Sequence, residues 1–272
     1  MTWAQKFSEW LVEEKEENIT TTDGQPIKVF SFNYNSTDDE TMSDWAKHFR
    51  NHYCPDEKID LLRKGTGLSK KDYLLTLKFP AQTGTPGPSV RSGDFSEILI
   101  SDYLEYILNY WVPRTRYSNK INRNSSPMGS DIIGFKLFDS NETNKDILTV
   151  IEAKASYTNT TENRLQKAID DSRKDNVRIA ESLNAMKQRY IEINNIENAK
   201  KVERFENISD RPYTMFYGAA ALFSNEIYDE KILRTSDTSN HVDIPHLMLI
   251  VVKGDNMMNL VHELYRRAAD EA

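Results

Sequence analysis

The order of apolar segments in the last two thirds of the chain limits its fold more than any other feature of the sequence. From residue 94 onward, hydrophobic periodicity predicts in turn a helix, two strands, a long helical region with breaks, two strands and a final helix. Such alternation is typical of a sheet covered by helices, so we expect an α/β domain with a mixed central sheet flanked by helices. The predicted segments are residues 94–111, 131–138, 147–155, 161–206, 213–223, 247–252 and 256–270.

A break in composition separates this domain from the first part of the chain. Segment Gln82–Ser89 contains two prolines and two glycines, which end regular structure. We therefore expect an N-terminal α/β region over residues 1–88, which could offer a docking surface to a partner, and a second domain over residues 89–272. The predicted elements of the N-terminal region are helices at 3–17 and 42–53 and strands at 27–34 and 73–79.

The helix predicted over residues 94–111 is apolar almost all the way round. A helix of this kind is buried on both sides. Glu97 lies on it, and a buried acid needs a partner or a metal ion to offset its desolvation. A structural explanation is also open, because Asp94 and Glu97 have the spacing of a capping box in which Asp94 is the N-cap.

The strands predicted over 131–138 and 147–155 are joined by a segment rich in residues that favour turns, Asp139–Asn144. We expect an antiparallel hairpin, which places Asp131 at the start of one strand beside Glu152 and Lys154 at the end of the other. Alternation along a strand puts the side chains of Glu152 and Lys154 on the same face of the sheet.

Two carboxylates and an ammonium group that meet in this way suit metal-assisted hydrolysis of a phosphodiester. Carboxylate oxygens bind hard cations such as Mg²⁺, and Mn²⁺ could take its place. The cation would activate water and phosphate, while Lys154 would orient the water or offset developing charge. Structural explanations stay open for each residue: Glu152 and Lys154 could form an ordinary ion pair on the sheet, and Asp131 could be a turn residue.

A basic segment precedes Asp131. Residues 112–127 contain four cationic side chains and no acid, although the whole chain is acidic, with a formal charge of -7. We predict that this segment binds a nucleic-acid backbone; a solvated loop that is basic by chance is the alternative. The cations are Arg114, Arg116, Lys120 and Arg123. Gln166, one turn into the next helix, could also reach the site, or could be a surface glutamine.

Several other classes of protein are excluded. Because the net charge is negative, DNA would have to bind at a local basic surface or to another subunit. The single cysteine, Cys54, rules out a disulfide framework and a cysteine-rich zinc site. His48 and His52 share a helix face, yet no third metal ligand is apparent. The longest apolar stretch, residues 247–252, is far shorter than the roughly 20 residues of a membrane-spanning helix, so we expect a cytoplasmic protein without membrane contact.

Three motifs resemble the signature of the HamA family, the nuclease subunit of Hachiman anti-phage defence, which is related to the AbpA phage-resistance proteins. They are Ser92–Glu97, Ser126–Phe135 and Val150–Ala155. The order of Glu97, Asp131, Glu152 and Lys154 is also similar to that of the PD-(D/E)xK nuclease superfamily. Ser130 stands where the superfamily motif has proline, and Asp170 where some members have a tyrosine after the helix glutamine.

The resemblance implies a restriction-endonuclease-like core and a metal-dependent DNA endonuclease that works with a separate helicase, HamB. Asp131 and Glu152 would then bind Mg²⁺ with help from Glu97, and Lys154 would position the attacking water. The alternative function is a docking or regulatory subunit of a helicase complex without catalytic activity, in which the acids form ordinary ion pairs.

Overall fold

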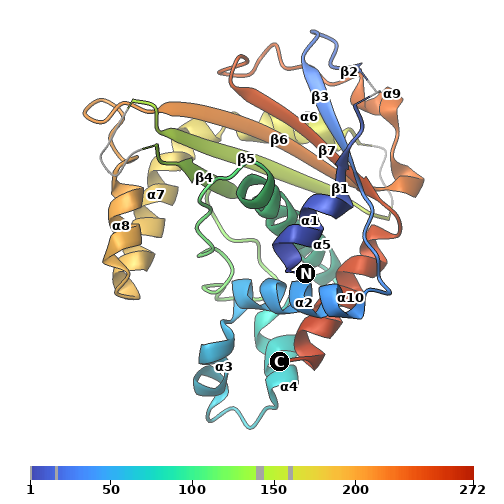
Figure 1. The fold of residues 1–272 in the computed structure, drawn as a ribbon, viewed down its shortest axis with the longest axis vertical. Coiled ribbons are helices and arrows are strands. Elements are labelled where there is room, and N and C mark those ends of the chain that lie inside the picture. Colours follow the sequence, from blue (N-terminus) through green and yellow to red (C-terminus); the bar gives the residue numbers. More distant parts are fainter. Residues whose placement is uncertain (1, 16–17, 139–143, 159–161) are drawn as a thin grey trace.

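The computed structural model describes residues 2–15, 18–138, 144–158 and 162–272. Its centre is a seven-stranded sheet in the order β1-β3-β7-β6-β5-β4, with the short β2 paired to β3 (Figure 1). The strands are β1 Leu11–Glu13, β2 Ile19–Thr20, β3 Pro26–Phe32, β4 Ile132–Lys136, β5 Ile147–Ser156, β6 Thr214–Ser224 and β7 Leu247–Gly254. Strands β3, β7, β6 and β5 are parallel, whereas β1 and β4 pair antiparallel at the edges, which confirms the predicted mixed sheet.

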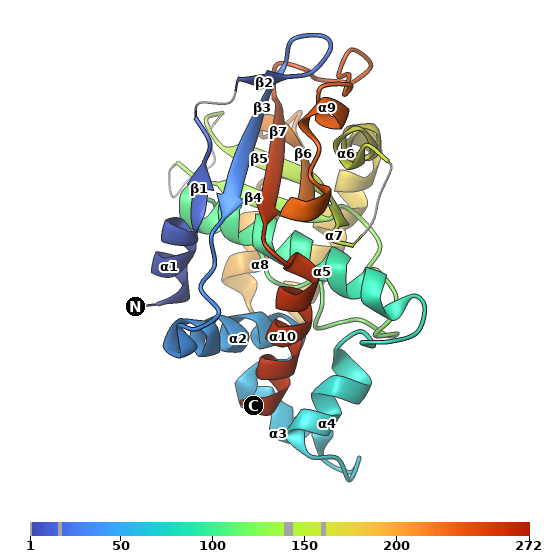
Figure 2. The ribbon, with the colours of Figure 1, turned by 90° about the vertical axis from the view of Figure 1, so that its right-hand side faces the viewer.

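Helices cover both faces of the sheet (Figures 1 and 2). On one face of the sheet lies α5, and α1, α2 and α10 pack around it in the same hydrophobic core. The other face packs against α6, α7 and α8. The helices are α1 Trp3–Trp10, α2 Asp39–Tyr53, α3 Asp56–Arg63, α4 Lys70–Tyr73, α5 Gly87–Asp102, α6 Arg164–Ser172, α7 Asp175–Glu192, α8 Ile196–Glu203, α9 Glu230–Leu233 and α10 Met257–Asp270. Shorter turns are the π-helical η1 Leu74–Lys78 and η2 Tyr103–Ile107 and the 3₁₀ turn η3 Asn225–Ile227.

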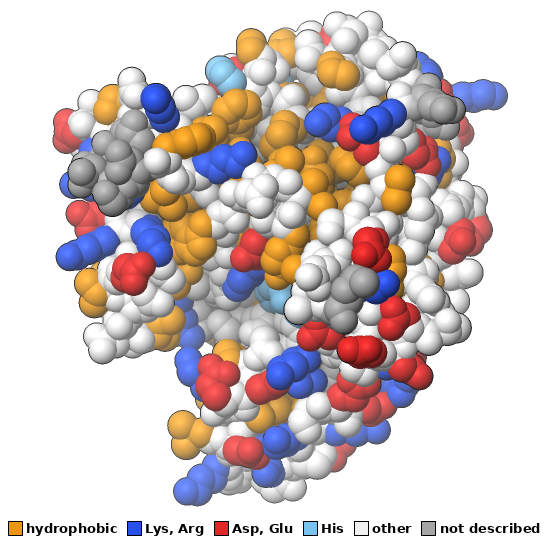
Figure 3. Space-filling model, viewed as in Figure 1, with side chains coloured by type: hydrophobic (Ala, Val, Ile, Leu, Met, Phe, Trp, Pro, Cys, Tyr) orange, Lys and Arg blue, Asp and Glu red, His pale blue; other side chains and the backbone are white. Residues whose placement is uncertain are grey.

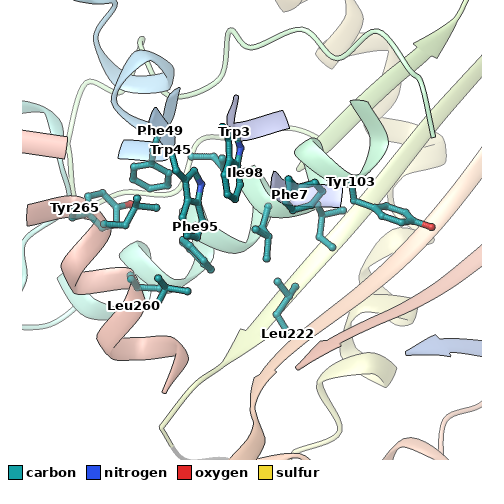
Figure 4. Close-up of a cluster of buried hydrophobic side chains, with 14 of the residues drawn as sticks. Trp3, Phe7, Trp45, Phe49, Phe95, Ile98, Tyr103, Leu222, Leu260 and Tyr265 are labelled. Atoms are coloured by element: carbon teal, nitrogen blue, oxygen red, sulfur yellow. The ribbon is translucent and has the colours of Figure 1, made fainter. Parts of the chain in front are cut away.

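Helix α5 is buried on both sides, as its apolar pattern predicts. Figure 4 shows Phe95 and Ile98 of α5 between aromatic side chains of α1 and α2 and the sheet residue Leu222. The ring centroid of Phe95 lies 5.9 Å from that of Trp45 in α2. An acid on such a helix has little access to water, and Glu97 is accordingly buried.

The capping-box explanation for Glu97 is wrong. Helix α5 begins at Gly87, so Asp94 lies in the helix interior instead of at its N-cap. Pro88 occupies the first turn, where a proline without a backbone N–H is tolerated. The last three residues of the predicted break, Gly87 to Ser89, are therefore part of helix α5. Asp94 is buried inside the protein.

The strand predicted over residues 73–79 is also wrong, because this segment is helical from Lys70 to Lys78. Ser69 caps the helix by accepting a hydrogen bond from the backbone N–H of Asp72. A short apolar run does not by itself separate a strand from a helix, and here the cap decides. Similarly, the helix predicted over residues 3–17 ends at Trp10, where Leu11 enters the sheet as β1.

The N-terminal region contributes strands to the same sheet as the rest of the chain. β3 pairs in parallel with β7 from Ile27 opposite Leu249 to Ser31 opposite Lys253. The division into residues 1–88 and 89–272 stays a prediction. Across the described parts of the chain, the helices are all too short or too polar to span a lipid bilayer.

Candidate active site

The hairpin of β4 and β5 brings Asp131 and Glu152 together. The two strands pair antiparallel, as predicted, with Ile132 opposite Ile151. Continued by one residue, this register places Asp131 opposite Glu152, and the backbone N–H of Ala153 donates a hydrogen bond of 3.4 Å to Asp131 Oδ2. The predicted turn falls largely on residues 139–143, outside the described residues.

Glu152 and Lys154 share one face of β5, as strand alternation predicts. Lys154 Nζ lies 2.5 Å from Glu152 Oε1 and 3.0 Å from Asp171 Oδ2 in α6. Their neighbours on the strand, Ile151 and Ala153, point to the opposite face, into the core around α5. Asp171 is an additional acidic neighbour of the lysine. The sequence did not indicate this contact, because Asp171 lies in a charged stretch that is typical of an exposed surface.

Glu97 approaches the same corner of the sheet from the α5 side. Its Oε2 accepts a hydrogen bond of 2.5 Å from the Tyr117 hydroxyl and lies 2.9 Å from Arg116 Nε. The same guanidinium reaches Asp131, with Nη2 2.8 Å from Oδ1. Arg116 therefore links the helix acid to the strand acid, a role that its position in a basic segment did not indicate.

Two cavities meet at Asp131. The larger, about 660 Å³, is lined by Glu97, Asp131 and Lys154 among others. The smaller, about 210 Å³, is lined by Asp131 and Arg116 together with Ser182 and Arg189 of α7. Three of the four predicted catalytic side chains thus line one cavity, and the fourth, Glu152, is buried beside them with 4% of its surface exposed.

Burial and the charge of Asp131 raise the pKa of two of these acids, Glu97 and Glu152. Desolvation raises the pKa of Glu97 to about 8; Arg116 lowers it and Asp131 raises it further. Desolvation likewise raises the pKa of Glu152 to about 8, and Asp131 adds to the rise while Lys154 opposes it. These are the shifts expected when carboxylates crowd together in a low-dielectric site.

A divalent cation fits this group of residues. Glu152 Oε2 is buried and makes no hydrogen bond to any residue that the structure describes. A buried, unpaired carboxylate oxygen beside a second carboxylate is unfavourable unless a cation offsets its charge. Oxygen donors of this kind are those that Mg²⁺ and Mn²⁺ prefer, so Asp131 and Glu152 would hold the ion.

These shifts predict how stability changes with pH in the absence of metal. A carboxyl whose folded-state pKa is raised stabilises the fold fully below its unfolded value, here 4.5, and this contribution is lost as the pH rises through about 8. We expect the free energy of unfolding of wild type in EDTA to fall relative to that of Glu152→Gln as the pH rises from 5 to 8, by up to about 1.4 kcal/mol per pH unit. Urea denaturation of both proteins at each pH measures the difference. The same pH dependence of the free energy of unfolding in the two proteins would contradict the raised pKa of Glu152.

All four cations of the predicted DNA-binding segment contact the protein itself. Arg114 Nη2 lies 2.7 Å from Asp102 Oδ1, and Lys120 pairs with Asp94. Arg123 donates to the backbone carbonyl of Phe79 at 3.3 Å. On the face of the molecule in Figure 3, acidic and basic side chains are interspersed. The role of these cations in DNA binding stays a prediction.

Gln166 contacts residues of a neighbouring loop. Its side-chain oxygen accepts a hydrogen bond of 2.7 Å from the backbone N–H of Asp237, and its nitrogen donates to Asp170 Oδ1 at 2.9 Å. A role for Gln166 at the site stays a prediction.

The structure supplies the third neighbour that the sequence did not show for His48 and His52. Asp102 Oδ1 lies 3.0 Å from His48 Nε2, which lies 3.2 Å from His52 Nε2. Arg114 already provides a positive charge against Asp102, and Trp3 Nε1 donates to its other oxygen at 3.1 Å. We interpret this group as a buried polar network that ties α1 and α2 to α5.

The fold and these contacts define a mixed α/β protein that carries a cluster of buried carboxylates and basic side chains at one edge of its sheet. Comparison with protein families identifies the chain more closely. The HamA family model matches residues 5–268 of the 272, so the chain belongs to the HamA family. Membership suggests a role in Hachiman anti-phage defence. A search of curated proteins found no match.

Proposed function

We propose that the protein is a Mg²⁺-dependent DNA endonuclease, the effector subunit of an anti-phage defence system that acts with a helicase partner. The observation that carries the proposal is the position of Asp131 just before β4, next to Glu152 on the paired strand β5. Lys154 contacts Glu152, and one buried oxygen of Glu152 makes no hydrogen bond to the described residues. Family membership supports the same conclusion.

Each side chain has a distinct task in this proposal. Asp131 and Glu152 would hold the cation, and Glu97 would assist them from the α5 side. When bound, a divalent cation supplies polarisation of the phosphoryl oxygen and a lower pKa for its bound water. Lys154 would hold the attacking water and offset charge that develops on the phosphate, and Mn²⁺ could replace Mg²⁺.

The charge distribution supports a partner that delivers the DNA. The chain has 42 acidic and 35 basic residues, so its overall field repels a polyanion. Two basic side chains of the site, Arg116 and Lys154, are already paired with carboxylates. A subunit that binds DNA and presents it to this corner would compensate for weak intrinsic affinity, as a helicase that tracks along DNA could do.

A cleavage assay tests this function. Linear, circular, single-stranded and double-stranded DNA are incubated with the protein in Mg²⁺ or in EDTA, with and without its helicase partner. We expect cleavage of at least one form in Mg²⁺, none in EDTA, and none with Asp131→Ala. Undiminished cleavage by Asp131→Ala would eliminate the mechanism.

A second function, a docking or regulatory subunit without catalytic activity, is favoured by one observation. Every predicted catalytic acid has a basic partner, since Arg116 contacts both Glu97 and Asp131, and Lys154 contacts Glu152. Calorimetric titration with Mg²⁺ or Mn²⁺ separates the two functions. A binding signal that Asp131→Ala abolishes favours the nuclease, and the lack of any signal favours the docking subunit.

A further inference from the structure

Asp175, the first residue of α7, is a buried acid that the mechanism above does not use. Its side chain is fully buried, with 0% of the residue exposed. Neither of its carboxylate oxygens makes a hydrogen bond of normal geometry within the described part of the chain. Burial of an unpaired carboxylate costs several kcal/mol, so such a residue calls for a ligand or a partner that offsets its charge.

The packing of α7 places Asp175 close to the proposed cation site. Ser182 lies seven residues further along α7 and therefore on the same helical face. Its hydroxyl accepts a hydrogen bond of 3.1 Å from the backbone N–H of Ser130, the residue before Asp131. This face of α7 thus lies against the start of β4, with Asp175 at its N-terminal end.

The electrostatics of Asp175 connect it to both proposed metal ligands. Burial raises its pKa to about 6, the Ser130 side chain lowers it, and the charge of Asp131 raises it further. In turn, Asp175 contributes to the raised pKa of Glu152. Arg178 and Arg116 oppose the rise at Asp175 without pairing with it. The charge of Asp131 therefore disfavours ionisation of both Glu152 and Asp175, and the charge of Asp175 disfavours ionisation of Glu152.

We propose that Asp175 is a positioning residue of the divalent-cation site, a third carboxylate that accepts hydrogen bonds from waters bound to the cation held by Asp131 and Glu152. Mg²⁺ normally keeps several waters and takes only one or two carboxylates directly, which suits an outer role for the third. This inference rests on the proposed function. It would explain why neither oxygen of Asp175 makes a hydrogen bond of normal geometry to the described residues, because water on the cation would supply the donors.

The inference predicts that loss of the Asp175 carboxylate weakens metal binding but raises the stability of the metal-free protein. Mn²⁺ is titrated calorimetrically into wild type, Asp175→Asn and Asp175→Ser, and their melting temperatures are measured in EDTA. We expect both variants to bind Mn²⁺ at least about 10-fold more weakly, as is typical when an outer partner of a metal site is lost. We also expect Asp175→Asn to melt at a higher temperature in EDTA, because the substitution removes a buried charge that no ion pair offsets. The matched control, Asp170→Asn, changes an exposed acid and should alter neither property.

A merely structural role, such as stabilising the N-terminus of α7, predicts the reverse: a lower melting temperature and unchanged Mn²⁺ affinity. That result would overturn the inference. If Asp131→Ala abolishes Mn²⁺ binding while Asp175→Asn leaves it unchanged, the inference fails and the proposed function stands. If wild type binds no Mn²⁺, both fail.

Discussion

Replacing Lys154 with methionine is expected to slow DNA cleavage by about 10²–10³-fold, the usual effect of removing one group that stabilises charge in a transition state. Methionine keeps much of the length and apolar stem of lysine but has no ammonium to hold water or balance charge on the phosphate. Cleavage rates under single-turnover conditions, with DNA and Mg²⁺ in excess, measure the effect on the chemical step.

The same variant should bind Mg²⁺ at least as tightly as wild type. In the metal-free protein, Lys154 pairs with Glu152 at 2.5 Å, so its loss frees a carboxylate for the cation. Lys174→Met is the matched control. Lys174 pairs with Asp171, which Lys154 also contacts, but the side chain of Lys174 is about half exposed. We expect that control to cut DNA normally. A Lys154→Met protein that cleaves at the wild-type rate would contradict the role of the ammonium.

Replacing Lys120 with methionine is expected to lower the free energy of unfolding by about 3–5 kcal/mol, a large part of the roughly 5–15 kcal/mol typical of a whole domain. The side chains of Lys120 and Asp94 are 3% and 1% exposed, and they form an ion pair. Loss of the lysine leaves Asp94 buried, with the Tyr53 hydroxyl, 2.7 Å away, as a remaining donor. Urea denaturation measures the change.

A second substitution tests whether the ion pair is the cause. Asp94→Asn in the Lys120→Met background removes the uncompensated charge and keeps an acceptor for Tyr53, so we expect it to recover most of the loss. Lys167→Met, at an exposed pair with Glu162, should cost less than about 1 kcal/mol. If Lys120→Met instead folds with normal stability and loses affinity for DNA, Lys120 is a DNA contact as its sequence position predicts.

Features that follow from local periodicity were predictable from the sequence. The shared face of Glu152 and Lys154 depends only on strand alternation, and the position of Asp131 follows from a hairpin whose two strands are close in the chain. The burial of α5 likewise follows from its apolar circumference. In the segment that begins at Lys70, a short apolar run predicts a strand, whereas the capping residue Ser69 favours a helix. The structure has the helix, and Ser69 caps it.

Contacts between elements that no hairpin joins were not predictable. The segment containing Arg116 and Lys120 is basic when taken alone, but its acidic partners Glu97 and Asp94 lie on the preceding helix α5. Asp175 stands among alternating charges that indicate a solvated surface, and only the packing of α7 against Ser130 reveals its burial. The sequence indicated the burial of Glu97 because this acid lies in a helix that is otherwise apolar. Asp175 lies among polar and charged residues, so the sequence did not indicate its burial.

The central claim is that Asp131 and Glu152 share one divalent cation. The most direct measurement is an anomalous difference map from crystals of the protein grown or soaked in Mn²⁺. We predict a peak between the carboxylates of these two residues, and its loss in Asp131→Ala. A map without density there, or with a peak only at His48, His52 and Asp102, would contradict the account.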